Sequence, residues 1–163
     1  MNPGVVARQR MRAAMEARDH AALVSLFAPG ITLHSPIIGT RFEGKEALSD
    51  LYAGILEGFR DYRYTYEMEG DGAQLLGFAG TLRGRKLEGV DMLRVDEDGL
   101  IVEMTVMIRP LSGLIAFLVE IGPHIARRRG RWQPLVLRVI GPPLPLIAAL
   151  VDRLAPRLVR TRS

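Results

Sequence analysis

The residue of this sequence best suited to chemistry is a single acidic residue, Asp91, inside an otherwise apolar strand. Side chains alternate between the two faces of a strand, so Asp91 shares its face with Leu87 and Leu93. A carboxyl group among apolar neighbours either gains a hydrogen-bond partner or loses its tendency to ionise. The pattern predicts a pocket in which Asp91 anchors a ligand or transfers a proton. The alternative is a structural aspartate, hydrogen-bonded to Tyr52 or to a backbone amide.

His34 is a second residue with suitable chemistry, because imidazole titrates near neutral pH and acts as base or acid. Its neighbour Ser35 would point to the opposite strand face, so at most one of the two enters the pocket. The three histidines, His20, His34 and His124, do not have metal-ligand spacing. The sequence also contains no nucleophile elbow, phosphate-binding glycine loop or nucleotide fingerprint. We therefore expect neither a metal nor a cofactor.

Composition indicates one ordinary globular domain with an extension, since the chain has 163 residues, 48% hydrophobic and 25% charged. It contains no cysteine, which excludes disulfides and thiolate chemistry and fits a reducing cytoplasm. The N-terminus lacks the apolar run of a secretory signal. The longest uncharged stretch, residues 139–151, is shorter than the about 20 apolar residues of a membrane-spanning helix. We expect a cytoplasmic protein.

The net charge of +4 is unevenly distributed along the chain. Residues 112–163 hold nine arginines against Glu120 and Asp152, a net +7, so the first 111 residues carry −3. The basic run of Arg127, Arg128, Arg129 and Arg131 has no interleaved aromatic residues, and we expect no nucleic-acid partner.

Helical spacing dominates the first sixty residues. Asn2-Pro3 is typical of a helix start, and a second helix is expected after Asp19, ending at residues 28–30. Residues 31–37 then predict a short extended segment, and residues 45–59 a third helix.

From Asp61 the period changes to two, with Tyr62, Tyr64, Tyr66 and Met68 expected on one strand face. Such a tyrosine stripe stacks on a planar ligand or belongs to a core or dimer surface. Turns expected at residues 70–72, 83–85 and 96–99 divide the region into four consecutive antiparallel strands. The predicted class is α+β, with three N-terminal helices covering one face of a curved antiparallel sheet. The space between helices and sheet is the expected pocket.

The remaining residues predict a helical extension, so the expected division is 1–111 and 112–163. Leu114, Ile115, Leu118 and Val119 recur at helical spacing and are expected to pack on the domain or on a partner subunit. The alternative is an interfacial helix that makes peripheral contact with an anionic membrane.

Two segments resemble the nuclear transport factor 2-like superfamily, the cone-shaped α+β fold of ketosteroid isomerases, SnoaL-like polyketide cyclases and limonene epoxide hydrolases. VDMLRVDEDGLIVEM, residues 90–104, resembles its last hairpin. ARDHAALVSLFAPGITLHSPI followed by RFEGKEAL resembles the second helix, short strand and third-helix start of SnoaL-like members. The similarity covers about residues 5–110.

The resemblance implies roles for individual residues. Asp91 falls where ketosteroid isomerases keep the protonated aspartic acid of their oxyanion hole. Ser35 stands at the position of their general base, and Met11 near that of their oxyanion tyrosine. Tyr52 matches one supporting tyrosine, while Phe27 occupies the place of the other. Steroid isomerisation by that mechanism is therefore not expected, and the last strand also lacks the aspartate of limonene epoxide hydrolases.

Two functions follow as expectations. The first is a SnoaL-like enzyme that cyclises or isomerises a small lipophilic carbonyl compound by proton transfer, with Asp91 assisted by His34 or Tyr52. The second is a non-catalytic domain that binds a hydrophobic ligand, with the tail as its membrane contact. In either case the expected ligand-lining residues are Met11, Phe27, Ser35, Leu87, Leu93, Met104, Val106 and Ile108.

A homodimer is also expected. The strand face opposite Asp91 carries Val90 and Met92, and the next strand adds Thr105 and Met107. A second subunit would cover this apolar surface.

Overall fold

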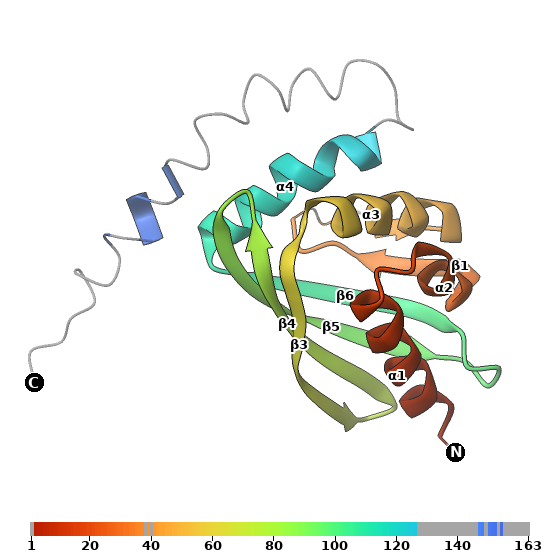
Figure 1. Cartoon of the computed structure of the whole chain (residues 1–163). Coiled ribbons are helices and arrows are strands. Elements are labelled where there is room, and N and C mark those ends of the chain that lie inside the picture. Colours follow the sequence, from red (N-terminus) through yellow and green to blue (C-terminus); the bar gives the residue numbers. More distant parts are fainter. Residues whose placement is uncertain are drawn as a thin grey trace, which may run out of the picture.

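The computed structural model describes residues 2–37, 39, 41–126, 147–148, 150–152 and 154. Its elements run in the order α1 (Pro3–Glu16), α2 (His20–Ser25), β1 (Phe27–His34), β2 (Arg41–Glu43), α3 (Lys45–Gly58), β3 (Arg60–Gly70), β4 (Ala73–Leu82), β5 (Arg85–Val95), β6 (Ile101–Arg109) and α4 (Leu111–Ala126). Figure 1 shows the curved sheet with the helices gathered on one side of it.

The first two helices begin at the expected caps. The side chain of Asn2 accepts a hydrogen bond from the amide of Gly4, with proline in the first turn. The Asp19 side chain accepts one from the amide of Ala22. Ala7, Met11 and Ala14, at helical spacing in α1, are all buried, so this helix presents its apolar face to the sheet.

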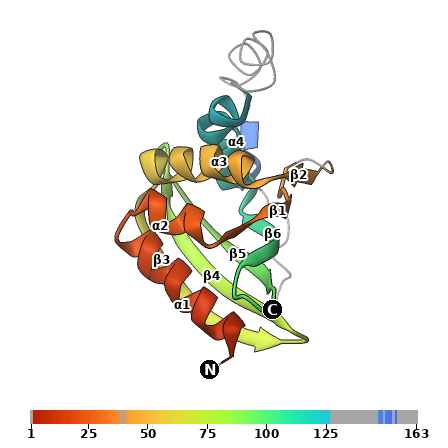
Figure 2. The same cartoon turned by 90° about the vertical axis from the view of Figure 1, so that its right-hand side faces the viewer.

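The sheet has the strand order β2-β1-β6-β5-β4-β3. Strands β3 to β6 form the predicted antiparallel meander, and the α+β class is confirmed. Strand β1 is antiparallel to β2 but parallel to β6, so the sheet is not purely antiparallel. The turned view in Figure 2 shows α1, α2 and α3 on the same side of the sheet.

The start of β1 differs from the prediction, and β2 was not predicted. Helix α2 ends at Ser25, and Phe27, expected at the end of that helix, is the first residue of β1. The amide of Ile101 donates a hydrogen bond to the Leu26 carbonyl, and Phe27 then pairs with Ile101. Pairing with a strand 74 residues further along the chain overrides the local helical pattern.

The core lies between the helices and the inner face of the sheet. Leu76 on β4, Leu93 on β5 and Met104 on β6 are fully buried there. On β5, Leu87, Asp91 and Leu93 are buried while Glu88 and Arg94 are exposed, so the predicted alternation of this strand is confirmed.

The predicted alternation of β3 is wrong in its second half. Tyr64 pairs with Phe78, but Tyr66 pairs with the adjacent Gly77, so an extra residue is inserted between the two tyrosines. Such a bulge moves every later side chain to the other face. Tyr62 and Tyr64 therefore face the core, while Tyr66 and Met68 are 48% and 59% exposed on the outer face.

Helix α4 packs against the domain through a different face from the predicted one. Ala116, Phe117 and Ile121 are buried, whereas the four residues expected to pack, Leu114, Ile115, Leu118 and Val119, are only half-buried. Gly113 lies so close to Leu87 that a Cβ atom there would stand 2.5 Å from the Leu87 Cβ. The division at residue 111 stays a prediction.

In the described part of the chain, no helix is long and apolar enough to cross a bilayer. The basic run of residues 127–131 lies outside the described residues.

Candidate ligand and proton-transfer site

Asp91 is a buried carboxyl group in the centre of the sheet, 4% exposed. It lies between Leu76 on β4 and Val106 on β6, its cross-strand neighbours. No hydrogen bond reaches its carboxyl group from any residue that the structure describes. Burial raises the pKa of Asp91 from 3.8 to about 7, because an apolar environment disfavours the charged form. Both protonation states are therefore accessible near neutral pH.

Three phenols stand around this carboxyl group, from Tyr52 on α3 and from Tyr62 and Tyr64 on β3. Burial raises the pKa of each well above its ordinary value, and the negative charge of Asp91 raises all three further. All three hydroxyls therefore remain protonated at neutral pH and are hydrogen-bond donors.

Two of these hydroxyls are weakly engaged. Tyr52 donates a hydrogen bond to the Sδ atom of Met104 over 3.3 Å, and a thioether is a weak acceptor. The Tyr64 hydroxyl is buried without a partner of normal hydrogen-bond geometry in the described chain. Its contact with the Tyr62 phenol lowers the pKa of Tyr64, but burial and Asp91 outweigh that effect. The rings of Tyr62 and Tyr64 meet edge to face at 5.3 Å.

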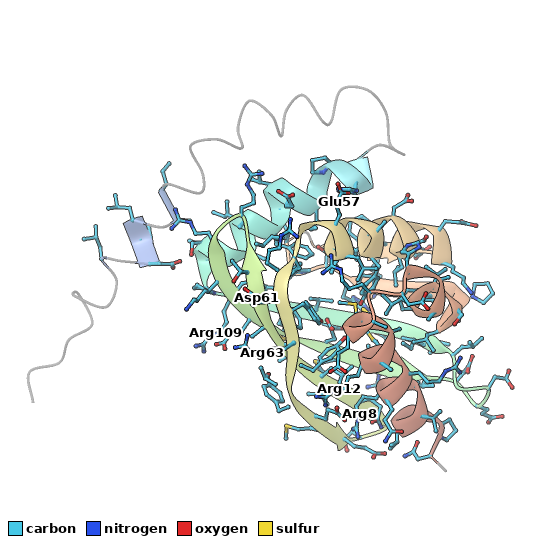
Figure 3. All side chains as sticks on the ribbon, in the orientation of Figure 1. Arg8, Arg12, Glu57, Asp61, Arg63 and Arg109 are labelled. Atoms are coloured by element: carbon cyan, nitrogen blue, oxygen red, sulfur yellow. The ribbon has the colours of Figure 1, made fainter. Side chains whose placement is uncertain are left out.

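An ion-pair network holds α1 against the strands that carry these groups. Arg12 pairs with Glu67 on β3, and Arg8 Nε lies 3.0 Å from Glu67 Oε2, although its geometry is not that of a hydrogen bond. Arg8 also donates to the buried side chain of Gln74 on β4 over 2.8 Å. Figure 3 shows both arginines on α1, on the side of β3. The network fixes α1, and with it Met11, over the inner face.

Most of the predicted site residues share the inner face with Asp91. Leu87, Leu93 and Met104 are buried there, and Val106 and Ile108 are half-buried. The half-buried pair marks the part of this face that solvent reaches. Met11 and Phe27 are fully buried, and the Phe27 ring lies 5.4 Å from that of Tyr52.

The structure places His34 and Ser35 away from this group. The parallel register aligns Leu33 with Met104 on the inner face and His34 with Thr105 on the outer face. There the His34 Nε2 atom lies 2.8 Å from Glu103 Oε1. Ser35 follows β1, and its hydroxyl accepts a hydrogen bond from the Ile37 amide. The structure therefore does not bring His34 together with Asp91, because the parallel pairing of β1 turns it outward.

The sequence reasoning missed Tyr62 and Tyr64 as partners of Asp91. Their alternation predicted a stripe, but that stripe included Tyr66 and was interpreted as a stacking surface for a planar ligand, as core or as a dimer surface, without a link to Asp91. The cross-strand register was needed to bring the two phenols to the Asp91 face.

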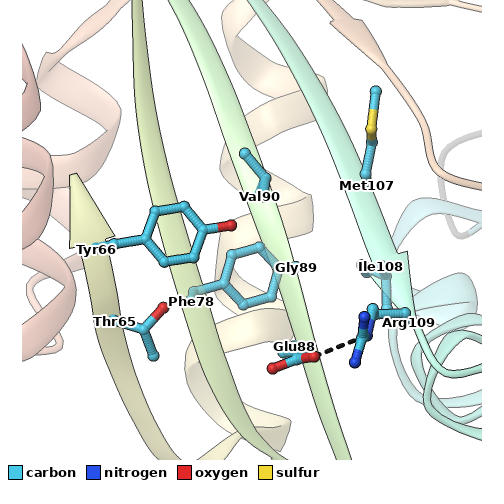
Figure 4. Close-up of a pocket in the computed structure, with 9 residues that line it drawn as sticks. All are labelled: Thr65, Tyr66, Phe78, Glu88, Gly89, Val90, Met107, Ile108 and Arg109. Atoms are coloured by element: carbon cyan, nitrogen blue, oxygen red, sulfur yellow. Dashed lines mark ion pairs between the residues drawn. The ribbon is translucent and has the colours of Figure 1, made fainter. Parts of the chain in front are cut away.

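A separate hollow of about 260 Å³ lies on the outer face of the sheet. Figure 4 shows it on the side of the sheet away from the helices, between Tyr66, Val90, Met107 and the ion pair of Arg109 with Glu88. The Tyr66 ring lies over Gly77, where a Cβ atom would come within 2.3 Å of it. Across the described residues, no three histidine, aspartate or glutamate side chains converge on a potential metal site.

Solved structures share this architecture. A steroid delta-isomerase from Pseudomonas aeruginosa matches with a TM-score of 0.69 and 28% identity, over 79% of this chain and 93% of that one. A protein with a cystatin-like fold from Silicibacter pomeroyi matches with a TM-score of 0.67 and 22% identity, over 85% and 94%. A Mycobacterium tuberculosis protein in complex with estradiol-17beta-hemisuccinate matches with a TM-score of 0.56 and 20% identity, over 68% and 100%.

No curated protein sequence matches the chain. The model of the SnoaL-like domain family matches residues 8–104, a range that includes Asp91 and the three tyrosines around it. With that match over more than half of its length and with the cone-shaped fold of the structures above, the chain belongs to the SnoaL-like domain family, in the ketosteroid isomerase-like branch of the nuclear transport factor 2-like superfamily.

Proposed function

We propose that this protein is an enzyme that isomerises or cyclises a small lipophilic carbonyl compound, polyketide-like or steroid-like, by proton transfer. The observation that carries the proposal is Asp91, buried without a hydrogen-bond partner among the described residues and faced by three protonated phenols. A carboxyl group with a pKa near 7 suits this chemistry, because general acid–base catalysis is most efficient when the pKa lies near the working pH.

In the proposed reaction, ionised Asp91 removes a proton from the carbon next to the ligand's carbonyl group. The C–H electron pair forms a carbon–carbon double bond, and the carbonyl electrons move to oxygen, giving an enolate. The hydroxyl of Tyr64 or Tyr52 donates a hydrogen bond to that oxygen, which stabilises its charge. Protonated Asp91 then returns the proton to another carbon of the conjugated system. Each group ends in its starting state, and the scheme uses no cofactor or metal.

The apolar surroundings support a lipophilic ligand. Leu87, Leu93 and Met104 share the face of Asp91, and half-buried Val106 and Ile108 are the proposed approach to it. The names of two structural relatives, a steroid delta-isomerase and a complex with estradiol-17beta-hemisuccinate, point to the same ligand class.

A non-catalytic ligand-binding domain is the second candidate. Within the described residues, the buried polar or charged side chains other than the tyrosines are Gln74, Asp91 and Ser112, so Asp91 is the single buried carboxyl group and no histidine is buried. An enzyme that needs separate acid and base groups would lack one of them here. The reaction above avoids this requirement, because one carboxyl group both takes and returns the proton.

One set of variants separates the two candidates. The binding probe is estradiol-17beta-hemisuccinate, and the turnover probe is a β,γ-unsaturated steroid ketone, whose conjugated product is followed by ultraviolet absorbance. Asp91→Asn should lower turnover at least about 100-fold while binding changes little, because the amide keeps a donor but transfers no proton. Asp91→Leu should keep the fold but lose both turnover and binding of the probe. Asp98→Asn, at an exposed turn, is the control and should match the natural protein.

Binding without turnover would overturn the enzyme and support the binding domain. Unchanged binding and rate in Asp91→Leu would remove Asp91 from the working site under either function.

We also propose that the protein is a homodimer formed through the outer face of the sheet. Tyr66, Met68 and Met107 are 48%, 59% and 58% exposed there, and Tyr66 and Met107 line the hollow of Figure 4. Glu88 and Arg109 place a negative and a positive group on the same face, which a two-fold interface can pair across its axis. Met107→Lys should convert a dimer to a monomer in light scattering. A monomer of the natural chain at micromolar concentration would contradict the proposal.

A cytoplasmic location is proposed on one observation, the absence of cysteine from the whole sequence. Cell fractionation tests it.

A further inference from the structure

The C-terminal segment presents an apolar helix face to solvent. Ile147, Leu150, Val151 and Leu154 are 58%, 56%, 46% and 41% exposed, and we call these four residues the tail stripe. The described residues between 147 and 154 are helical. Side chains at i, i+3, i+4 and i+7 lie along one face of a helix, so the four form a continuous apolar surface.

The opposite side of this segment holds it against the domain. Ala148 is buried, and the Asp152 carboxylate accepts a hydrogen bond from the Ser112 amide over 2.9 Å. That amide lies in the first turn of α4, where helix geometry leaves backbone donors unpaired and favours an anion. Because Ala148 and Asp152 hold one side of the segment against the domain, the tail stripe on the other side points outward. Leu111, which adjoins Ser112, is 46% exposed and adds to the apolar surface.

The charge of the surrounding sequence decides which partner this surface fits. Residues 112–163 carry nine arginines and two acidic residues. Two copies of so basic a segment repel each other, which disfavours a second copy of this chain as the partner. An anionic bilayer supplies both an apolar layer for the stripe and a negative surface for the arginines.

We propose that the tail stripe is the lipid-facing side of an interfacial helix that binds the protein to anionic bilayers. Apolar burial and electrostatic attraction act together in such a contact, and neither requires a membrane-spanning helix.

The position of the tail stripe suggests a use for this membrane contact. That use, unlike the contact itself, rests on the proposed function. Asp152 caps α4, and α4 packs through Gly113 against Leu87, on the strand and face of Asp91. A bilayer at the stripe would therefore stand beside the end of the domain next to the candidate site. A lipophilic ligand dissolved in that bilayer would have a short path to the protein.

Vesicle sedimentation of the full chain tests the proposal. The probes are neutral phosphatidylcholine vesicles and vesicles in which a quarter of the lipid is phosphatidylglycerol. The natural chain should bind the anionic vesicles at low salt and lose most of that binding in high salt, because salt screens the arginines. Leu150→Ser combined with Val151→Ser should weaken binding roughly tenfold or more, since two apolar side chains no longer enter the interface. Both side chains are exposed, so the fold should be retained.

The control is Ala21→Ser, at an exposed apolar residue of α2 outside both the tail stripe and the proposed dimer face, which should bind vesicles as the natural chain does. Equal binding by the stripe variant, or no preference for anionic vesicles, would overturn the proposal. A stripe variant that changes the oligomeric state instead would assign the stripe to a second copy. Ligand binding measured without vesicles should not change in the stripe variant, so failure of this proposal and failure of the proposed function are distinguishable.

Discussion

The hydroxyl of Tyr52 donates its hydrogen bond to the Sδ atom of Met104, 3.3 Å away, on the strand beside the one that carries Asp91. A thioether is a poor acceptor compared with a carbonyl oxygen. A ligand carbonyl can therefore replace Met104 as the partner of this buried phenol at little energetic cost, and Tyr64 offers a second hydroxyl that no described residue engages with normal geometry.

Removing the Tyr64 hydroxyl and removing the Tyr52 hydroxyl should have opposite effects on the stability of the protein. Tyr64→Phe deletes a buried hydroxyl that lacks a well-formed bond, so the free energy of unfolding should rise by about 1 kcal/mol. Tyr52→Phe deletes a weak bond and should lower that free energy by less than about 1 kcal/mol. Both variants should bind the steroid probe less tightly. Urea unfolding and a binding titration measure the two effects, and a destabilised Tyr64→Phe protein would show that its hydroxyl is satisfied.

The stability of the protein should fall as pH rises from about 4 to about 7. In this range the folded protein keeps a proton on Asp91 that the unfolded chain has released, so each step upward in pH favours unfolding. A rise in pKa from 3.8 to about 7, at about 1.4 kcal/mol per pKa unit, corresponds to a loss on the order of 4 kcal/mol, complete above the folded pKa.

Asp91→Asn should remove this pH dependence. The variant should match the natural protein near pH 4 and exceed its stability near pH 8, as measured by unfolding at a series of pH values. The difference in free energy of unfolding between the natural protein and Asp91→Asn should therefore change between pH 4 and pH 8. If it stayed the same, Asp91 would titrate near its ordinary pKa.

Gly89→Ala should destabilise the sheet by about 2 kcal/mol or more, because overpacking forces neighbouring groups to move. A Cβ atom at this position would stand 2.3 Å from the Met107 carbonyl oxygen and 2.4 Å from the Phe78 ring. Gly70→Ala is the control, since a Cβ atom there meets nothing within 4 Å. Thermal unfolding of both variants tests the difference, and equal melting temperatures would contradict the close packing at Gly89.

Truncation after Pro110 should lower the melting temperature and the solubility of the protein. It removes Phe117 and Ile121 from the core, and loss of one large buried side chain costs about 3 kcal/mol. It also uncovers Phe59, whose ring lies 6.4 Å from that of Phe117. A truncated chain as soluble and heat-stable as the natural one would make residues 111–163 a separable extension.

Local sequence patterns were sufficient to predict much of the fold. The caps at Asn2 and Asp19 follow from side chains that satisfy free backbone amides within three residues. The face of Asp91 followed from the period of two in β5, because no bulge interrupts its pairing with β4. The family resemblance added the cone-shaped arrangement, and with it the expectation of an apolar inner face.

Long-range pairing decided the rest of the candidate site. A bulge in β3 turns Tyr64 toward Asp91 and Tyr66 away, and nothing in the alternation of the tyrosines distinguishes the two. The parallel pairing of β1 with β6 likewise turns His34 outward, toward Glu103. The bond between Ser112 and Asp152 joins residues forty positions apart. The period of a sequence specifies which side chains share a face within one element, but register and contact between distant elements depend on packing of the whole chain, and only the tertiary structure contains that information.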